Sequence, residues 1–169
     1  MSASTLVQKM IYIGIDPGLT GAIAAITEDG IELFDMPITR DKTLDYRKLS
    51  LILKQLSMCG DCTAYIEKVG SRTGQGVTSM FTFGMVYGAA ITAVAAAGVP
   101  LRYVLPQQWK ASFGLIGSGK DSSRLTCLKL YPELQSQLHL KKHHGRGDAL
   151  LIARYGLEFS RATSNALVA

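Results

Sequence analysis

The sequence predicts an α/β domain built on a mixed five-stranded sheet with helices on its faces. Three short apolar segments come early in the chain, separated by Pro-Gly and Asp-Gly turns, which is typical of antiparallel strands. Farther along, helical patterns alternate with short apolar segments, which favours parallel strands joined by right-handed crossovers. Together these observations indicate one mixed sheet.

Turn residues and apolar periodicity define each element. Pro17-Gly18 turns the first strand into the second, and Asp29-Gly30 makes a tight hairpin between the second and the third. Gly98 and Pro100 end the long helix that precedes the last strand. We expect strands at 10–16, 21–27, 30–36, 63–67 and 99–105, and helices at 45–57, 77–97, 106–113, 120–131 and 144–158.

Two of the predicted helices are expected to pack differently. In the helix at 45–57, apolar residues recur at helical spacing and form one face. Residues 73–101 carry no charge and are long enough to cross a bilayer, but they are built largely from the weakly apolar Ala, Gly and Thr. We therefore expect a central buried helix there and no membrane contact. The apolar face of the first helix comprises Tyr46, Leu49, Leu53 and Leu56.

This order of elements matches the ribonuclease H-like fold. We expect one domain at 10–160, preceded by a disordered or extended lead at 1–9 and followed by a tail at 161–169. A lead of about ten residues is too short for a signal or transit peptide. A cytoplasmic location, in a bacterium or a phage-infected cell, is therefore expected, and an organelle is the alternative if a transit peptide has been removed.

The cysteines also favour a reducing compartment. The chain has three, Cys59, Cys62 and Cys127, which cannot all pair with one another. Cys59 and Cys62 have the C-x-x-C spacing of a redox or zinc motif, but no second Cys or His pair follows at zinc spacing. We interpret them as two cysteines in a loop between a helix and a strand.

Basic residues are concentrated in the second part of the chain. The net charge is +5, and residues 100–169 hold 10 Lys and Arg against 4 Asp and Glu. Residues 1–99 hold 8 and 9. Because the basic residues are dispersed and do not form one tail, this asymmetry favours nucleic acid over a membrane surface as the partner. A merely basic surface is the alternative.

Two carboxylates are predicted to meet at one edge of the sheet. Alternation along the first strand puts its isoleucines on one face and Asp16 on the other. Glu67 ends the strand at 63–67. If these two strands are parallel neighbours, their carboxyl ends coincide, and active sites of open α/β sheets collect at such ends.

The last helix adds a histidine and a third carboxylate. His144 and Asp148 are four residues apart and share one helical face, which continues with apolar residues and should therefore point inward. Burying an unpaired charge is costly, and a divalent cation would compensate it. Oxygen-rich sites favour Mg²⁺ or Mn²⁺ over zinc. Two such ions, about 4 Å apart, can activate a water and stabilise the leaving oxygen of a phosphodiester, with Asp16 bridging both.

Each of these residues also has an ordinary structural explanation. Asp16 alone would cap the turn that follows it, and Glu67 would be a solvated strand end. His144 would be a surface histidine, and the adjacent His143 is an open alternative for the site. Asp148 would pair with a nearby arginine. The convergence of all four positions favours the catalytic interpretation.

Several sequence blocks resemble the RuvC family of Holliday-junction resolvases. They are IGIDPGLTGAIA, the strand-end Glu67, GVTSMFTFGMVYGAA, VPLRYVLPQQWK, GKDSSR and KKHHGRGDALLIARYG, in that order, over residues 10–158. The Gln-x-Trp-Lys, Lys-Asp-x-x-Arg and His-Gly-Arg-x-acid signatures are similar to those of the chloroplast branch and its phage and bacterial relatives.

The resemblance implies a homodimeric endonuclease that nicks a four-way DNA junction symmetrically with Mg²⁺ or Mn²⁺. A branch-migration helicase is a further expected partner. Lys120 is implied to hold the scissile phosphate, and a lysine that merely starts a helix beside Asp121 is the alternative. The catalytic and metal-binding roles are carried onto Asp16, Glu67, His144 and Asp148.

Residues around the site are expected to touch DNA. The Gly-rich loop at 70–76 suits insertion at a branch point, and Met80 and Phe81 follow it. Trp109 is as consistent with a core position as with a DNA contact. The predicted phosphate contacts are Arg72, Lys110, Lys141, Lys142 and Arg146.

Two features depart from many bacterial members of the family. Gly70 stands where those members carry an aromatic residue that wedges into the junction, so this contact must come from elsewhere. His144 and Asp148 are spaced i, i+4, as in the chloroplast branch, where many bacterial enzymes have i, i+3. The preferred cut site therefore does not transfer between branches.

Two glycines in the long helix bear on oligomerisation. Gly84 and Gly88 are four residues apart and would let this helix approach another backbone closely. In the family a comparable helix lies at the dimer interface. Close packing of the helix on its own sheet explains the glycines equally well.

Other functions remain open from the sequence. A nuclease of the same fold that acts on flaps, branched DNA or structured RNA would use the same carboxylates. A catalytically silent junction-binding protein would share the DNA surface. GIDPGLTG also resembles the first phosphate loop of sugar-kinase and actin-like ATPases, but those proteins need two such domains.

Overall fold

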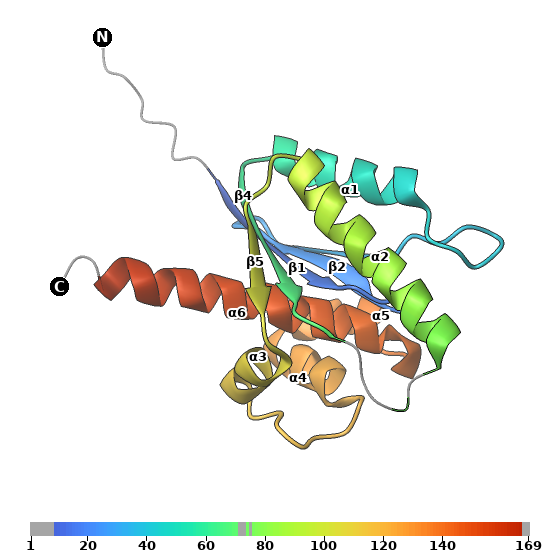
Figure 1. Ribbon diagram of the computed structural model, residues 1–169. Helices are drawn as coiled ribbons and strands as arrows, with labels where there is room; N and C mark the ends of the chain where they lie inside the picture. The colour runs from blue at the N-terminus through green and yellow to red at the C-terminus, as the bar shows by residue number, and fades with distance from the viewer. Residues whose placement is uncertain (1–8, 71–73, 75, 167–169) are drawn as a thin grey trace, which may run out of the picture.

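A central mixed sheet organises the fold. The structure, a computed structural model, describes residues 9–70, 74 and 76–166. The strand order is β3-β2-β1-β4-β5, and β1 pairs antiparallel with β2 and parallel with β4 (Figure 1). The predicted five-stranded mixed sheet is therefore confirmed. The strands are β1 (Met10–Asp16), β2 (Ala22–Ile26), β3 (Ile31–Asp35), β4 (Asp61–Glu67) and β5 (Leu101–Val104).

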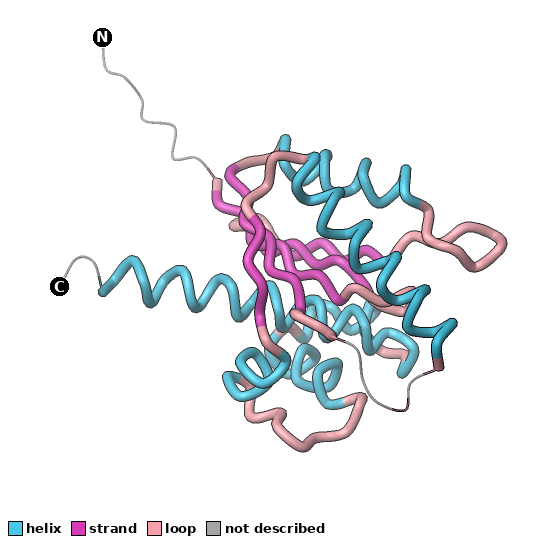
Figure 2. Tube along the Cα trace, in the orientation of Figure 1, coloured by secondary structure: helices cyan, strands magenta, loops and turns pink. Residues whose placement is uncertain are grey.

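Helices cover both faces of this sheet. α1 (Tyr46–Met58) and α2 (Val77–Ala96) lie on one face, and α6 (His144–Ala166) crosses the other (Figures 1 and 2). The shorter helical segments gather on the α6 side, beyond the carboxyl ends of β4 and β5. They are α3 (Pro106–Ser112), α4 (Ser122–Leu130), η1 (Pro132–Leu134), α5 (Gln135–Leu138) and η2 (Lys141–His143).

Alternation along β1 divides the core into two parts. The isoleucines of β1 are buried with residues of α1 and α2, whereas Tyr12 is buried with residues of α6. Burial of apolar side chains on both faces is the main driving force for assembling these layers. Because Asp16 shares the parity of Tyr12, it lies on the α6 face of the sheet.

α6 approaches β1 closely because of a glycine. A Cβ atom at Gly14 would collide with the Ala149 carbonyl and the Ala153 backbone. Gly147 in α6 likewise leaves room for the backbone of Arg124 in α4. This close packing brings the first turns of α6 to the end of β1, where the candidate site forms.

The long apolar helix α2 is not the central buried helix that its lack of charge suggested. Phe81 is 69% exposed, and only one stripe of α2 residues is buried against the core. By length and composition α2 could cross a membrane, and 22% of its apolar window is buried. Since α2 also packs against α1 and joins β4 to β5, we interpret it as a surface helix of the folded domain. Its buried residues are Val86, Ala90, Ala93 and Val94.

The buried face of α1 also differs from the prediction. Tyr46 is 49% exposed, and Ile52 is buried with the three leucines of that face. The side chain of Asp45 accepts a hydrogen bond from the Lys48 N–H and caps the helix. Tyr46 is therefore the first helical residue and lies at the end of the buried face.

The C-terminal part of the chain is more helical than predicted. α6 continues to Ala166, so residues 161–166, expected as a tail, belong to the helix. These residues are exposed and show no apolar periodicity that would reveal a helix. Hydroxyls of Thr163 and Ser164 instead bond backbone carbonyls one turn earlier. The short helical segments between 132 and 143 were not predicted, because they too lack a periodic apolar pattern.

Candidate active site

Two carboxylates end the central strands side by side. The register pairs Ile15 with Ile66, so Asp16 and Glu67 are the next residues of two adjacent parallel strands. Both side chains are partly buried. β1 and β4 are therefore the parallel neighbours that were predicted, and their pairing brings both carboxylates to one edge of the sheet.

Asp148 of α6 joins these two carboxylates. Burial raises the pKa of Asp16 to about 8, and the negative charges of Asp148 and Glu67 add to this shift. The positive charges of Lys110 and Lys120 act in the opposite direction. Near neutral pH, the three carboxylates therefore do not all carry full charge without a further cation.

A buried serine holds Asp148. Burial raises the pKa of Asp148, while a hydrogen bond with the Ser123 side chain opposes this shift. Ser123 is 6% exposed in the first turn of α4, so the two polar groups satisfy each other away from water. This role of Ser123 was not predicted from the sequence. The only signal was the position of Ser123 in GKDSSR, because the contact depends on how closely α4 packs on Gly147.

Glu67 is held from α3. Nε1 of Trp109 donates a hydrogen bond to Oε1 of Glu67 over 3.0 Å. Trp109 is 1% exposed, so it is a core residue whose polar edge faces the candidate site. The first turn of α3 is fixed in turn by the Gln108 side chain, which accepts a hydrogen bond from the Leu105 N–H over 2.9 Å.

Two lysines bring positive charge to the carboxylates. Lys110 and Lys120 both lie within electrostatic reach of Asp16 and Asp148. Nζ of Lys110 is also 5.2 Å from the centroid of the Trp109 ring. Lys110 was predicted only as a phosphate contact, and the structure places it beside the site together with Lys120.

The loop that carries Lys120 is anchored by an arginine. Arg124 is 6% exposed and donates two hydrogen bonds of 2.6 Å to the carboxylate of Asp121. It also donates to the carbonyl of Leu138 over 2.7 Å. The i, i+3 spacing of Asp121 and Arg124 was the available sequence signal for this anchor.

The two adjacent histidines have different surroundings. Burial and then the positive charge of Lys120 lower the pKa of His144. His143 is 8% exposed, and its neighbours are Arg146 and Asp35. Burial is also the main cause of the lowered pKa of His143. The structure therefore places His144 beside the lysine of the carboxylate cluster and His143 toward the end of β3.

Arg146, predicted as a phosphate contact, is engaged within the fold. Its Nε and Nη2 donate to the two carboxylate oxygens of Asp35 over 2.6 and 2.7 Å. Its Nη1 donates to the carbonyl of Gln137 over 2.8 Å. This bidentate pair clamps the start of α6 to the end of β3 and uses the donors that a phosphate would need.

The other predicted DNA contacts are more accessible. Lys141 and Lys142 are exposed in η2, directly before α6. Phe81 is exposed and Met80 partly exposed in the first two turns of α2. Arg72 lies outside the described residues.

The donor groups suit a hard divalent cation by charge and type. Carboxylate oxygens are the ligands that Mg²⁺ and Mn²⁺ prefer, and the partly buried, mutually repelling carboxylates are the condition that a cation would relieve. Within the part of the chain that the structure describes, however, no group of three His, Cys, Asp or Glu side chains is arranged to hold a metal ion. In this arrangement Trp109 and Ser123 contact Glu67 and Asp148.

Part of the sequence has a curated relative. Over 94 residues, which are 55% of this chain, it is 34% identical to Holliday junction resolvase MOC1, chloroplastic, of Chlamydomonas reinhardtii. The match covers only 11% of the length of that relative. No protein-family model matches the sequence.

Solved structures of RuvC share the fold. Thermus thermophilus RuvC in complex with a Holliday junction substrate superposes with a TM-score of 0.54 at 19% identity, over 91% of this chain and 96% of that chain. A second structure of Thermus thermophilus RuvC gives a TM-score of 0.55 at 20% identity, over 91% and 97%. The predicted ribonuclease H-like fold is therefore confirmed.

Proposed function

We propose that this chain is an endonuclease of the RuvC family that resolves four-way DNA junctions by paired symmetric nicks. The observation that carries the proposal is that Asp16 and Glu67 end two adjacent parallel strands and that the charge of Asp148, from α6, acts on Asp16. The partial sequence similarity to a Holliday junction resolvase and the likeness of the fold to RuvC support it.

The reaction is hydrolysis of a phosphodiester with Mg²⁺ or Mn²⁺, two ions in each site. When bound, such ions activate a water and stabilise the leaving oxygen. Their ligands are Asp16, Glu67, His144 and Asp148. The donor types support this assignment, and the charges of Asp148 and Glu67 already act on Asp16 in the structure. Completing the metal site requires the carboxylates to close up from the arrangement described above.

The chain's own side chains position the substrate. Lys120 and Lys110 lie beside the carboxylates and compensate the charge of the scissile phosphate. The lowered pKa of His144, caused by burial and Lys120, keeps its imidazole neutral near pH 7 and able to bind a cation or accept a proton. Trp109 and Ser123 orient the carboxylates that they contact.

The DNA surface extends from this site to the first turns of α2 and α6. Lys141 and Lys142 contact phosphates, and Phe81 and Met80 approach the branch point. Arg72, the further predicted DNA contact, lies outside the described residues. The exposure of the two lysines and of Phe81 supports these assignments. The excess of basic residues after residue 100 provides the corresponding electrostatic attraction.

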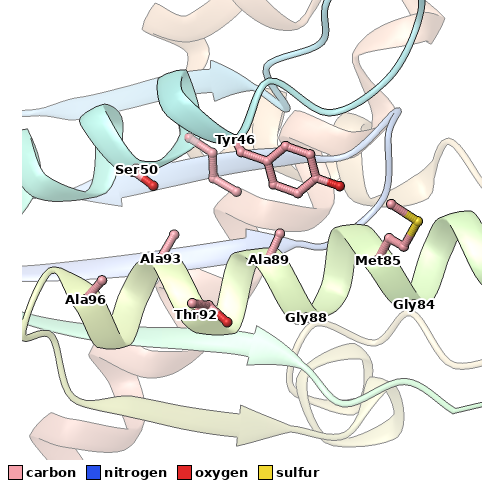
Figure 3. A pocket seen from close by; sticks show the side chains of 10 residues that line it. Tyr46, Ser50, Gly84, Met85, Gly88, Ala89, Thr92, Ala93 and Ala96 are labelled. Carbon is pink, nitrogen blue, oxygen red and sulfur yellow. The ribbon is translucent and has the colours of Figure 1, made fainter.

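A second copy of the chain is the partner in solution. The apolar groove between α1 and α2 has a volume of about 470 Å³, and Gly84, Met85 and Gly88 line it (Figure 3). A Cβ atom at Gly84 or Gly88 would meet nothing within 4 Å, so neither glycine is explained by packing on its own sheet. The exposed apolar side chains of α2 then become buried in a symmetric dimer, which supplies the two active sites that paired nicks require.

The cellular setting remains a prediction. A cytoplasmic location is expected, and the chloroplastic Chlamydomonas relative favours the organellar alternative. A branch-migration helicase that delivers junctions is a further predicted partner.

A cleavage assay tests the proposed function. Labelled four-way junctions, flaps, linear duplexes and structured RNA are incubated with the chain, with and without Mg²⁺, and analysed on denaturing gels. We expect paired nicks at symmetric positions that are confined to the junction and require the metal ion. Equal cutting of all substrates would indicate a general nuclease, and junction binding without cleavage would indicate a silent binder.

Two aspartate variants make this assay specific for the carboxylate site. Asp16→Asn should abolish nicking while junction binding stays intact or becomes tighter, because it removes charge at the cation site without altering the DNA surface. Asp41→Asn changes an exposed aspartate that is not among the charges acting on Asp16 or Asp148, and this variant should cut normally. Metal-dependent nicking by Asp16→Asn would disprove the site assignment.

A further inference from the structure

A second cavity lies between the edge strand β5 and the C-terminal half of α6. It has a volume of about 360 Å³, which is at the lower end of pockets that hold small organic groups. In Figure 1 β5 crosses α6 at this edge of the sheet, and residues of both elements line the cavity. The cavity is lined by Tyr65, Arg102, Tyr103, Val104, Gln108, Tyr155 and Phe159.

The walls of this cavity offer flat aromatic surfaces and one cation. The rings of Tyr155 and Phe159 are stacked, with centroids 6.2 Å apart and an interplanar angle of 21°. The guanidinium carbon of Arg102 lies 5.9 Å from the centroid of the Phe159 ring. Phe159 is 44% exposed, so part of this surface is open to a ligand.

The back of the cavity is closely packed. Tyr65 is 3% exposed, and its ring packs so closely on α6 that a Cβ atom at Gly156 would collide with it. Tyr65 and Arg102 are register partners in the parallel pair β4–β5, so both side chains lie on the α6 face of the sheet. The cavity is therefore formed by the fold itself and does not depend on a mobile segment.

The charges around the cavity favour a ligand with acceptor groups over a cationic one. None of the described residues that line the cavity is acidic, and Arg102 forms no salt bridge with any other described residue. A guanidinium that stacks on a ring still directs its N–H donors outward in its own plane. The cavity thus suits a planar group that stacks on an aromatic ring and carries acceptor oxygens or a phosphate.

The cavity is also close to the carboxylate cluster. Tyr65 precedes Glu67 by two residues on the same strand face, which is about 7 Å along β4. Val104, at the cavity wall, is the register partner of Glu67. Gln108 at the same wall is followed directly by Trp109, which contacts Glu67. A DNA strand whose phosphate lies at the carboxylates has neighbouring nucleotides within reach of this cavity.

We propose that this cavity binds one unpaired nucleotide of the DNA strand, with its base stacked on Phe159 and Tyr155 and with Arg102 and Gln108 bonding its polar groups. The proposal deepens the proposed function, on which its choice of ligand rests. Stacking on aromatic side chains is the common means by which proteins hold unpaired bases without regard to sequence. Because only an unpaired base can enter such a site, the enzyme binds more tightly to DNA whose base pairing is interrupted next to the cut.

The test compares two single strands that differ only in their bases. The full chain is titrated, without divalent metal, with a short oligothymidylate and with an abasic strand that has the same phosphates. We expect the thymidine strand to bind about 5-fold to 160-fold more tightly, which is the range that stacking of one base on an aromatic side chain contributes. Phe159→Ala should remove this difference, and Met58→Ala, which alters an exposed residue on α1, should preserve it.

Arg102→Ala should also reduce the preference for the thymidine strand over the abasic strand. Because Arg102 is exposed, its removal leaves the core intact, and thermal unfolding of both variants verifies that they fold. An unchanged preference for the thymidine strand in both variants would overturn the proposal, as would equal binding of both strands by the unaltered chain. Equal binding is also the result expected if the cavity instead holds an aromatic side chain of a partner protein.

Junction nicking by the same preparation separates this proposal from the proposed function. A chain that nicks junctions but shows no base preference overturns the nucleotide site alone. A chain that does not nick junctions but shows a Phe159-dependent base preference retains the nucleotide site and overturns the resolvase assignment.

Discussion

The indole N–H of Trp109 donates a hydrogen bond to Oε1 of Glu67 over 3.0 Å. Trp109 is almost fully buried, so this donor has no access to solvent water and depends on the carboxylate. The contact links α3 to the end of β4 and thus connects the packing of the core with the orientation of a candidate metal ligand. Trp109 is therefore a positioning residue for Glu67, and the effect of its N–H can be measured separately from the packing of its ring in the core.

Trp109→Phe should weaken metal binding more than it weakens the fold. Phenylalanine keeps most of the apolar volume but lacks the N–H that holds Glu67. Loss of an outer hydrogen-bond partner typically costs about tenfold to 100-fold in metal affinity or activity. We expect the Mn²⁺ concentration for half-maximal binding, measured by calorimetry, to rise about tenfold. Trp109→Ala should in addition lower the free energy of unfolding by about 3–5 kcal/mol. Unchanged Mn²⁺ binding in Trp109→Phe would show that Glu67 does not need this contact.

The raised pKa of Asp16 predicts how stability depends on pH. Burial and neighbouring carboxylates raise this pKa from 3.8 to about 8, so the folded protein binds the proton more tightly than the unfolded chain. The contribution of Asp16 is therefore fully present below pH 3.8 and is lost as the pH rises toward 8. Asp16→Asn should be more stable than the unaltered chain at pH 8 and similar to it at acidic pH, as measured by urea unfolding.

A bound divalent metal ion should restore the stability that ionisation of Asp16 removes at high pH. Because Mg²⁺ or Mn²⁺ competes with the proton, we expect metal to raise the melting temperature of the unaltered chain more at pH 8 than at pH 6. Asp16→Asn should show little response, and Asp41→Asn should respond like the unaltered chain. A metal response in Asp16→Asn equal to that of the unaltered chain would place the ions elsewhere.

The pair formed by Arg146 and Asp35 should act as one structural unit. The Asp35 side chain is 62% exposed and that of Arg146 is 20% exposed, so solvent screening keeps the energy of the pair modest. Arg146→Ala and Asp35→Ala should each lower the free energy of unfolding by about 1 kcal/mol, and the double variant by less than their sum. Additive losses would argue against the clamp. If Arg146 contacts phosphate, Arg146→Ala should also weaken junction binding while Asp35→Ala does not.

Gly88→Leu should weaken the dimer without unfolding the monomer. The site of a new side chain at Gly88 is open, so the monomer should fold, and replacing a helical glycine should even favour the helix by up to about 1 kcal/mol. A leucine there should block close approach of a second copy. We expect light scattering to show a dissociation constant at least about tenfold higher than that of the unaltered chain. Ala162→Leu, on the exposed end of α6, serves as the matched control. An unchanged dimer in Gly88→Leu would exclude this face as the interface.

The sequence by itself determined where the strands lie along the chain and which strand ends carry the candidate catalytic carboxylates. Period-two alternation separated the isoleucines of β1 from Asp16, and the turn residues placed the antiparallel hairpins. The parallel pairing of β1 with β4, inferred from the intervening helix, then followed from general rules of topology. These signals are local or nearly so, and for this reason they are readable without coordinates.

Contacts between distant segments were decided only by the tertiary structure. The polar edge of Trp109 and the hydroxyl of Ser123 face carboxylates because α3 and α4 pack against β4 and α6, and no spacing in the sequence encodes those distances. The same holds for Arg146, whose partner Asp35 lies 111 residues earlier in the chain. The lack of charge in α2 likewise did not reveal that much of this helix is exposed. Burial depends on how many neighbours surround a helix and not on its composition alone.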